Sequence, residues 1–99
     1  MSFVSTQPED LTAAAGDLQS VGSAMTAQNA DAAAPTTSVV PAAADEVSAL
    51  TATQLAAHAQ IYQAVSAQAA AIHDMFVSTL GSSAGSYAAT EAANAVAAG

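Results

Sequence analysis

The sequence contains no lysine, no arginine and no cysteine among its 99 residues. Its eight acidic side chains are therefore unopposed, and the formal net charge is -8. A chain without cations cannot neutralise phosphates, which argues against nucleic-acid binding and against attraction to anionic lipid headgroups. Without cysteine no disulfide can staple the fold, and the redox compartment leaves no mark on the sequence.

Large apolar side chains are also scarce, although 53% of the residues are hydrophobic. Alanine supplies 30 of them, whereas there are two Phe, two Tyr and no Trp. Because apolar burial is worth about 25 cal/mol per Å², a short alanine-rich chain gains little from a core of its own. Alanine is also the best helix former, so the composition predicts an all-α protein that needs a partner.

Targeting and membrane segments are missing as well. The start, M-S-F-V-S-T-Q-P-E-D, has neither the basic region nor the apolar region of a secretory signal peptide. No uninterrupted apolar window of about 18 residues exists, so a transmembrane helix is not expected. We expect a chain that is cytosolic or that is exported by a route that reads no N-terminal signal.

Prolines and a glycine divide the sequence into segments. Pro35 and Pro41 flank T-T-S-V-V, and because proline disrupts helix interiors, this stretch predicts a short connector. Gly81-Ser82-Ser83 is expected to weaken or end the second helix. The predicted elements are helix one at about 7–34, a connector at 35–40, helix two at about 41–80 and a tail at 81–99.

The first helix has a recognisable start. Thr6-Gln7-Pro8-Glu9 fits a capping box, in which Thr6 accepts from an orphan amide and Glu9 reaches back. Pro8 is tolerated in a first turn, where its missing donor is not needed. Beyond this start, apolar residues recur every three or four positions along one narrow stripe. That stripe consists of Leu11, Ala14, Leu18, Val21 and Met25.

The second helix carries two such stripes on neighbouring faces. The first consists of Val47, Leu50, Gln54, His58, Ile61, Val65, Gln68, Ile72 and Phe76. The second consists of Leu55, Tyr62, Ala69, Phe76 and Leu80. A helix that is apolar on two faces needs two neighbours, and this chain supplies one. A short connector forces the helices antiparallel, so we expect a long two-helix hairpin that forms half of a four-helix bundle.

The polar members of the first stripe lie where a helix interface is expected. Gln54, His58 and Gln68 would need hydrogen-bonding partners there, some of them on another chain. We hypothesise that they fix register and partner choice. Leucine at positions 54 and 68 tests this hypothesis, which unchanged partner selectivity would contradict.

Catalytic chemistry finds no support in the sequence. It has no H-E-x-x-H, no Gly-rich phosphate loop and no G-x-S-x-G. The two histidines, His58 and His73, are 15 residues apart, which separates them by roughly 22 Å along one helix. They cannot share a metal ion, and a structural or solvent role is expected for both. We therefore predict no enzyme, no catalytic or metal-binding residue and no cofactor.

The tail contains one pair of notable residues. In S-Y-A-A-T-E-A-A, Tyr87 lies four positions before Glu91. If this stretch is helical, both side chains lie on one face. Spacing alone also fits an ordinary surface pair, so the pattern by itself leaves its role open.

Several motifs occur in an order that resembles the PE proteins of mycobacteria over essentially the whole chain. The first is S-F-V-S-T-Q-P-E-D-L, whose Pro8-Glu9 dipeptide names that family. V-V-P-A-A-A-D-E-V-S, A-Q-I-Y-Q-A-V-S-A-Q-A and H-D-M-F-V-S-T-L follow along helix two. S-Y-A-A-T-E then matches the family's Y-x-x-x-[D/E] secretion signal at Tyr87 and Glu91. The chain looks most like short members linked to the fifth ESX-type secretion system.

The resemblance implies a partner and an export route. PE proteins pair with a PPE protein as a heterodimeric four-helix bundle, which a type VII secretion system exports. The EspG chaperone binds the PPE partner and thus concerns this chain only indirectly. The predicted hairpin and PPE interface consists of Leu11, Leu18, Val21, Met25, Val47, Leu50, Leu55, His58, Ile61, Tyr62, Val65, Ile72, Phe76 and Leu80.

The resemblance also implies a location, and it leaves two alternatives open. Members are assembled in the cytosol and then become secreted or displayed at the cell surface. One alternative is a self-associating helical bundle, like related small type VII substrates. The other is a component of a transport path in the envelope. The lipase-like activity of some longer members is not expected, since it resides in C-terminal domains that follow the PE domain.

Overall fold

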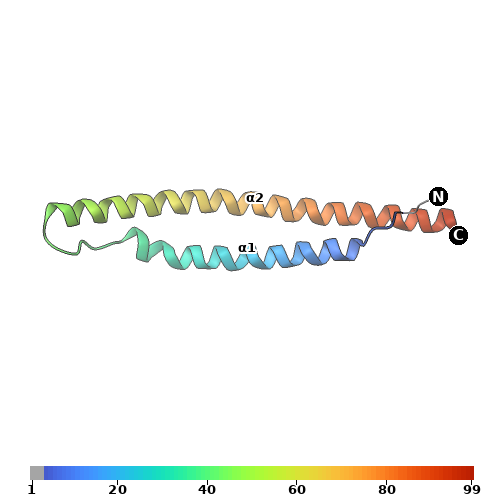
Figure 1. Cartoon of the computed structure of the whole chain (residues 1–99), viewed down its shortest axis with the longest axis horizontal. Helices are drawn as coiled ribbons and strands as arrows, with labels where there is room; N and C mark the ends of the chain where they lie inside the picture. Colours follow the sequence, from blue (N-terminus) through green and yellow to red (C-terminus); the bar gives the residue numbers. More distant parts are fainter. Residues whose placement is uncertain (1–3) are drawn as a thin grey trace.

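The protein is an antiparallel pair of long helices. The computed structural model describes residues 4–99, and within that range it contains two α-helices and no strand. Helix α1 spans Pro8–Thr37, and helix α2 spans Glu46–Ala98. They lie side by side along a rod of 80 × 19 × 18 Å (Figure 1). The all-α fold and the two-helix hairpin are thus confirmed. Ser2 and Phe3 of the N-terminal motif lie outside the described residues.

The start of α1 differs from the predicted capping box. Gln7 is the N-cap, and its side chain makes no capping hydrogen bond. Pro8 takes the first helical position as expected, and Glu9 and Asp10 lie in the first turn near the positive end of the helix dipole. The prediction that Thr6 caps this helix was wrong. Its hydroxyl instead donates to the carboxylate of Glu91, far along the chain. A hydrogen bond to a charged carboxylate is stronger than the bond between neutral groups that a threonine cap would make.

Helix α1 ends three residues later than expected. It runs through Pro35, which lies in its last turn, to Thr37. The hydroxyl of Thr36 donates to the carbonyl of Ala32 at 2.6 Å, and that of Thr37 donates to the carbonyl of Ala33 at 2.7 Å. These bonds add support to a turn in which proline lacks its amide donor.

Helix α2 begins at Glu46 and not near residue 41, so the connector is 38–45. The reason is local capping, because the side chain of Asp45 accepts from the amide of Ser48 at 3.2 Å. Hydrogen bonds from the side chain and the amide of Ser48 hold the pKa of the Asp45 carboxyl below its ordinary value.

The tail is a continuation of α2 and not a separate segment. The helix passes through Gly81 without a break and reaches Ala98. One glycine costs only about 1 kcal/mol in a helix interior. Leu80 and Ala84 on either side of it lie against α1, and Ala84 is 3% exposed. Packing therefore holds the helix together where the local sequence predicts its end.

The two helices meet through small and polar side chains, which we call the hairpin interface. On α2 its buried and half-buried members follow one another at alternating intervals of three and four residues. They are Ala52, Ala56, Ala59, Gln63, Ser66, Ala70, His73, Val77, Leu80 and Ala84. On α1 they include Leu11, Ala15, Leu18, Gly22 and Asn29. Short side chains let the two backbones approach closely but bury little apolar area.

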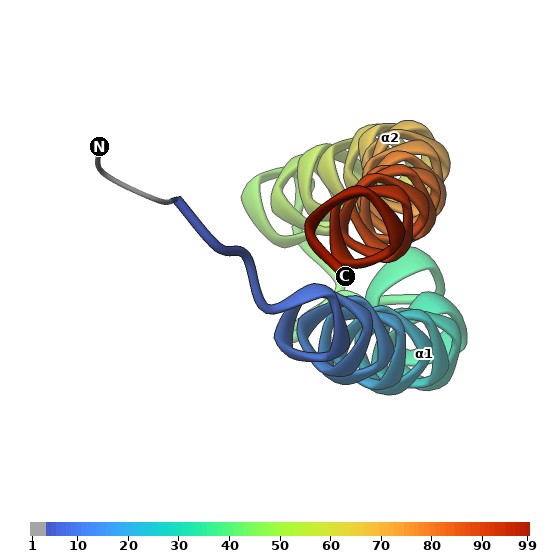
Figure 2. The same ribbon diagram turned by 90° about the vertical axis from the view of Figure 1, so that its right-hand side faces the viewer.

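Hydrogen bonds fix the register of the hairpin. The Nε2 of His73 donates to the carbonyl of Leu18 at 2.6 Å. The edge of that imidazole formed by Cδ2 and Nε2 lies against Gly22, where an added Cβ would stand 2.6 Å from Cδ2 of His73. Closer to the connector, the Tyr62 hydroxyl donates to the side-chain Oδ1 of Asn29 at 2.7 Å. The side-chain Nε2 of Gln63 donates to the backbone carbonyl of Asn29 at 2.9 Å. The view along the rod shows that each helix has the other as its one neighbour (Figure 2).

Candidate interaction surface

Most of the large apolar side chains of α2 lie outside the hairpin interface, the exceptions being Val77 and Leu80. Those outside it between Val47 and Phe76 are more than half exposed, down to Leu55 at 52% and Tyr62 at 51%. We call this surface, together with His58, the outer face. It consists of Val47, Leu50, Leu55, His58, Ile61, Tyr62, Val65, Ile72 and Phe76. Monomeric soluble proteins rarely expose a contiguous apolar surface of this length, and such surfaces mark interaction sites.

The residues predicted for the interface divide into two groups. Leu11, Leu18 and Leu80 are half-buried in the hairpin interface. Val21 and Met25 of α1 are exposed, as are all the members of the outer face. Most of the predicted set is thus left uncovered by the hairpin itself. The sequence reasoning missed the hairpin interface of α2 almost completely, because its signal is a stripe of alanines in a chain rich in alanine.

Two shallow grooves follow the junction between α1 and α2. One, beside the connector, is lined mainly by apolar atoms, among them those of Pro35, Val39, Leu55 and Tyr62. The other lies further along and is lined by residues that include Met25 and Tyr62. Both grooves combine side chains from the two helices. A second helical element could therefore contact α1 and α2 at once.

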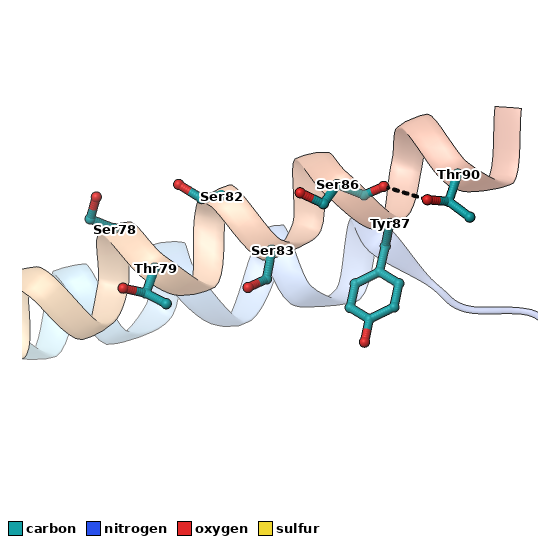
Figure 3. Close-up of a pocket in the computed structure, with 7 residues that line it drawn as sticks. All are labelled: Ser78, Thr79, Ser82, Ser83, Ser86, Tyr87 and Thr90. Atoms are coloured by element: carbon teal, nitrogen blue, oxygen red, sulfur yellow. Dashed lines mark hydrogen bonds between the residues drawn. The ribbon is translucent and has the colours of Figure 1, made fainter. Parts of the chain in front are cut away.

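The chemistry of the outer face changes after Phe76. Thr79 and Ser86 follow Ile72 at steps of seven residues, and Ser83 and Thr90 follow Phe76 in the same way. Figure 3 shows these hydroxyl side chains and Tyr87 around a shallow hollow on α2. The Thr90 hydroxyl donates to the carbonyl of Ser86 at 3.0 Å. The same side of one helix is thus apolar up to Phe76 and hydroxyl-rich beyond it.

Tyr87 and Glu91 lie one turn apart on the regular helix of the tail. Tyr87 is 47% exposed, and its ring projects from α2 (Figure 3). Glu91 is half-buried because Thr6 contacts it. Its Oε1 accepts from the amide of Thr6 at 3.0 Å and from the hydroxyl of Thr6 at 2.9 Å. The predicted signal residues are therefore neighbours, and one of them is joined to the segment before α1.

The described part of the chain offers neither a metal site nor a membrane-spanning helix. Within residues 4–99 no three His, Cys, Asp or Glu side chains lie close enough to hold a metal ion. His58 lies on the exposed outer face, whereas His73 is bound to Leu18 in the hairpin interface. Neither helix offers a stretch apolar enough, at sufficient length, to span a bilayer.

The family model of the PE family matches residues 4–94 of the sequence. The chain belongs to the PE family. It is 70% identical over 98 residues to PE family protein PE13 of Mycobacterium tuberculosis, and the match spans 99% of both chains. It is also 61% identical over 98 residues to PE family protein PE8 of the same organism, which covers 36% of that protein.

Other relatives share this region as part of a longer chain. The PE-PGRS family protein PE_PGRS33 of M. tuberculosis is 59% identical over 95 residues, which is 20% of its length. The chain thus spans nearly all of PE13 but a minor part of PE8 and PE_PGRS33. Membership of the family implies the context of mycobacterial PE and PPE proteins and type VII secretion. In that context a PPE partner and a secreted or cell-surface location are general.

Proposed function

We propose that this PE protein is a non-enzymatic type VII secretion substrate that pairs with a PPE protein and carries an export signal in its tail. The observation that carries the proposal is the outer face of α2, whose large apolar side chains remain more than half exposed in the hairpin. Fully burying such a side chain is worth about 1.5–3 kcal/mol, so a partner that covers the face has a strong drive to bind.

The shape of the hairpin fits a second helical hairpin as that partner. The grooves between α1 and α2 offer Met25, Tyr62 and Leu55 to an element lying along the junction. A PPE hairpin packed there would complete a four-helix bundle, and the exposed Val21 would lie at its edge. The polar residues Gln54, His58 and Gln68 would then select the partner by their hydrogen bonds.

The tail would remain free in such a complex. Hydrophobic burial offers a partner little beyond Phe76, where the outer face becomes rich in hydroxyls. Tyr87 and Glu91 follow this change, on a helix that keeps them in fixed relation. We propose that they are the signal read by the secretion machinery of the fifth ESX-type system. Pro8 and Glu9 are the family dipeptide at the start of α1.

The route follows from these assignments. The complex assembles in the cytosol, EspG binds through the PPE partner, and the dimer is exported to the surface or beyond. No cofactor and no catalytic residue take part. Co-purification of the chain from a mycobacterial lysate, followed by mass spectrometry, would identify the PPE protein.

Replacement of Tyr87 by alanine tests the signal. Export into the culture filtrate should be abolished, because the aromatic side chain of the proposed signal is removed. The helix itself should persist, because alanine has the highest helix propensity. The amount of PPE protein that co-purifies should not change. Ser86→Ala, which alters the adjacent position, is the matched control and should be exported normally. Loss of pairing in Tyr87→Ala would instead mean that the tail is structural.

A second copy of this chain is the other candidate occupant of the outer face. The same exposed apolar residues could pack in a homodimeric four-helix bundle. A homodimer would keep its mass when a PPE protein is added, whereas the proposed complex exchanges it for a heterodimer. A transport role in the envelope would be performed by the exported complex and leaves these pairing results unchanged.

A further inference from the structure

The segment before α1 crosses to the far end of α2. In Figure 1 it runs from the start of α1 toward the last turns of the long helix, near the C-terminus. Thr6 in this segment is half-buried, although the residues on both sides of it are exposed. Its amide and its hydroxyl both donate to Oε1 of Glu91, at 3.0 and 2.9 Å. Residues 85 positions apart are thereby joined at the proposed signal.

The contact selects the residue type at position 6. Any residue except proline could offer the backbone amide, but only serine or threonine adds a hydroxyl at this distance. Bonds to a carboxylate are charge-assisted, and they are stronger than those between neutral groups. Two donors on one oxygen hold the carboxylate in one orientation. The side chain of Glu91 would otherwise sample several rotamers.

Thr6 also makes the last hydrogen bonds that the structure describes between the tail and the rest of the hairpin. Residues 92–99 are all exposed, and no hydrogen bond to α1 or its leading segment is found among them. The turn that carries Tyr87 and Glu91 would be free to fray from one side without this tie. The contact therefore acts where the helix leaves its neighbour.

We propose that Thr6 is a positioning residue for the export signal. The signal then has two segments, which are the Tyr87–Glu91 turn and the segment at Thr6, whose hydrogen bonds orient Glu91. The inference rests on the proposed function of Tyr87 and Glu91. It adds that the machinery reads a carboxylate that is already oriented by a contact within the chain. Preorganisation of this kind strengthens recognition because the ordering cost is met before binding.

Thr6→Val is the direct test, since valine keeps the shape of threonine and replaces the hydroxyl with a methyl group. Export into the culture filtrate, followed with an antiserum to the chain, should fall about tenfold, as expected for loss of a hydrogen bond to a charged group. Thr6→Ser keeps a hydroxyl and should be exported almost as well as the native chain. Thr12→Val is the matched control, because the Thr12 hydroxyl bonds only within α1, to the carbonyl of Pro8.

Two further readouts separate positioning from a structural role. Amide hydrogen exchange of residues 88–98 in the purified complex should speed up in Thr6→Val and not in Thr12→Val. The amount of co-purifying PPE protein should be the same in both variants. In a chain that already carries Glu91→Ala, Thr6→Val should not speed up the amide exchange of residues 88–98 any further, because the two residues act as one unit.

The export of these variants distinguishes failure of the positioning role of Thr6 from failure of the proposed signal. Normal or raised export of Thr6→Val, with Glu91→Ala blocked, would overturn the positioning role and leave the signal intact. Normal export of both Tyr87→Ala and Glu91→Ala would overturn the signal itself, and the positioning role with it. Reduced pairing of Thr6→Val with the PPE protein would also overturn the inference, since Thr6 would then serve the fold. Thr6→Pro removes both donors and should show the larger loss of export.

Discussion

The two sides of α2 differ in the size of their side chains. Toward α1 lie Ala52, Ala59 and Ala84, all buried, whereas the opposite side presents Leu50, Ile61 and Phe76, each more than half exposed. A helix that folded for the hairpin alone would be expected to turn its large residues inward. The difference shows that the hairpin interface sets geometry and register, while most of the apolar area remains available for another molecule.

Hydrogen bonds supply at the hairpin interface what small side chains cannot. His73 to Leu18, and Tyr62 and Gln63 to Asn29, tie the helices at two separate levels. Each such bond contributes only about 0.5–1.5 kcal/mol net, but each requires one alignment of the helices. The internal contact is therefore specific and weak. The outer face, with large side chains and few fixed bonds, has the opposite character.

The largest effect is expected from a charge on the outer face. Ile61→Asp should weaken pairing with the PPE protein about a hundredfold or more, because a buried, unpaired carboxylate replaces an apolar anchor. Titration calorimetry or a pull-down series measures the change. Gln60→Asp adds the same charge at an adjacent exposed position outside this face and is the control. Equal losses in both variants would mean that net charge, and not the outer face, governs pairing.

A smaller effect is expected at the hairpin interface, where Gly22→Ala should lower thermal stability. The new Cβ would stand 2.6 Å from the imidazole of His73, which must swing away from the carbonyl of Leu18. The cost should be about 1–3 kcal/mol, as for overpacking elsewhere. Circular dichroism during heating of the purified complex measures it.

Gly16→Ala is the matched control for that experiment. An added Cβ at Gly16 meets nothing within 4 Å, so alanine there should stabilise α1 by about 0.5–1 kcal/mol through its helix propensity. The two substitutions are chemically identical and lie on the same helix. Equal shifts in melting temperature would contradict the role of His73 at the hairpin interface.

The smallest effect is expected at the connector. Asp45→Ala removes the N-cap of α2. It should slightly lower the melting temperature of the complex and leave pairing with the PPE protein unchanged. Because hydrogen bonds lower the pKa of Asp45 in the folded chain, the stabilisation is present at neutral pH. It should disappear as the pH falls through that lowered pKa. Melting curves of the complex, recorded from neutral pH down to below that lowered pKa, should therefore bring variant and native chain together.

The sequence predicts the main architecture and misses its details for identifiable reasons. The two helices follow from Pro35 and Pro41, their antiparallel arrangement follows from the short connector, and the unpaired apolar face follows from Leu50, Ile61 and Phe76 at helical spacing. The expected break at Gly81 did not occur, since one glycine costs little beside packing at Ala84. The expected end before Pro35 was also too early, because its turn is supported by threonine hydroxyls.

Long-range polar contacts could not be read from the sequence. Thr6 matches a capping box in every local respect, yet its hydroxyl bonds to Glu91, which only the antiparallel packing brings near. The position of His73 against Gly22 depends on the register of the hairpin in the same way. Among the candidate site residues, the outer face was predictable from periodicity. The tie between Thr6 and the proposed signal was not.

Light scattering on the purified chain, with and without its PPE protein, tests the central claim most directly. If the outer face is a partner interface, the chain alone should aggregate or remain partly helical. The mixture should give the mass of a one-to-one heterodimer, and Ile61→Asp should abolish that species. A chain that stays monomeric and unfolds cooperatively on its own, with no change of mass when the PPE protein is added, would contradict the account.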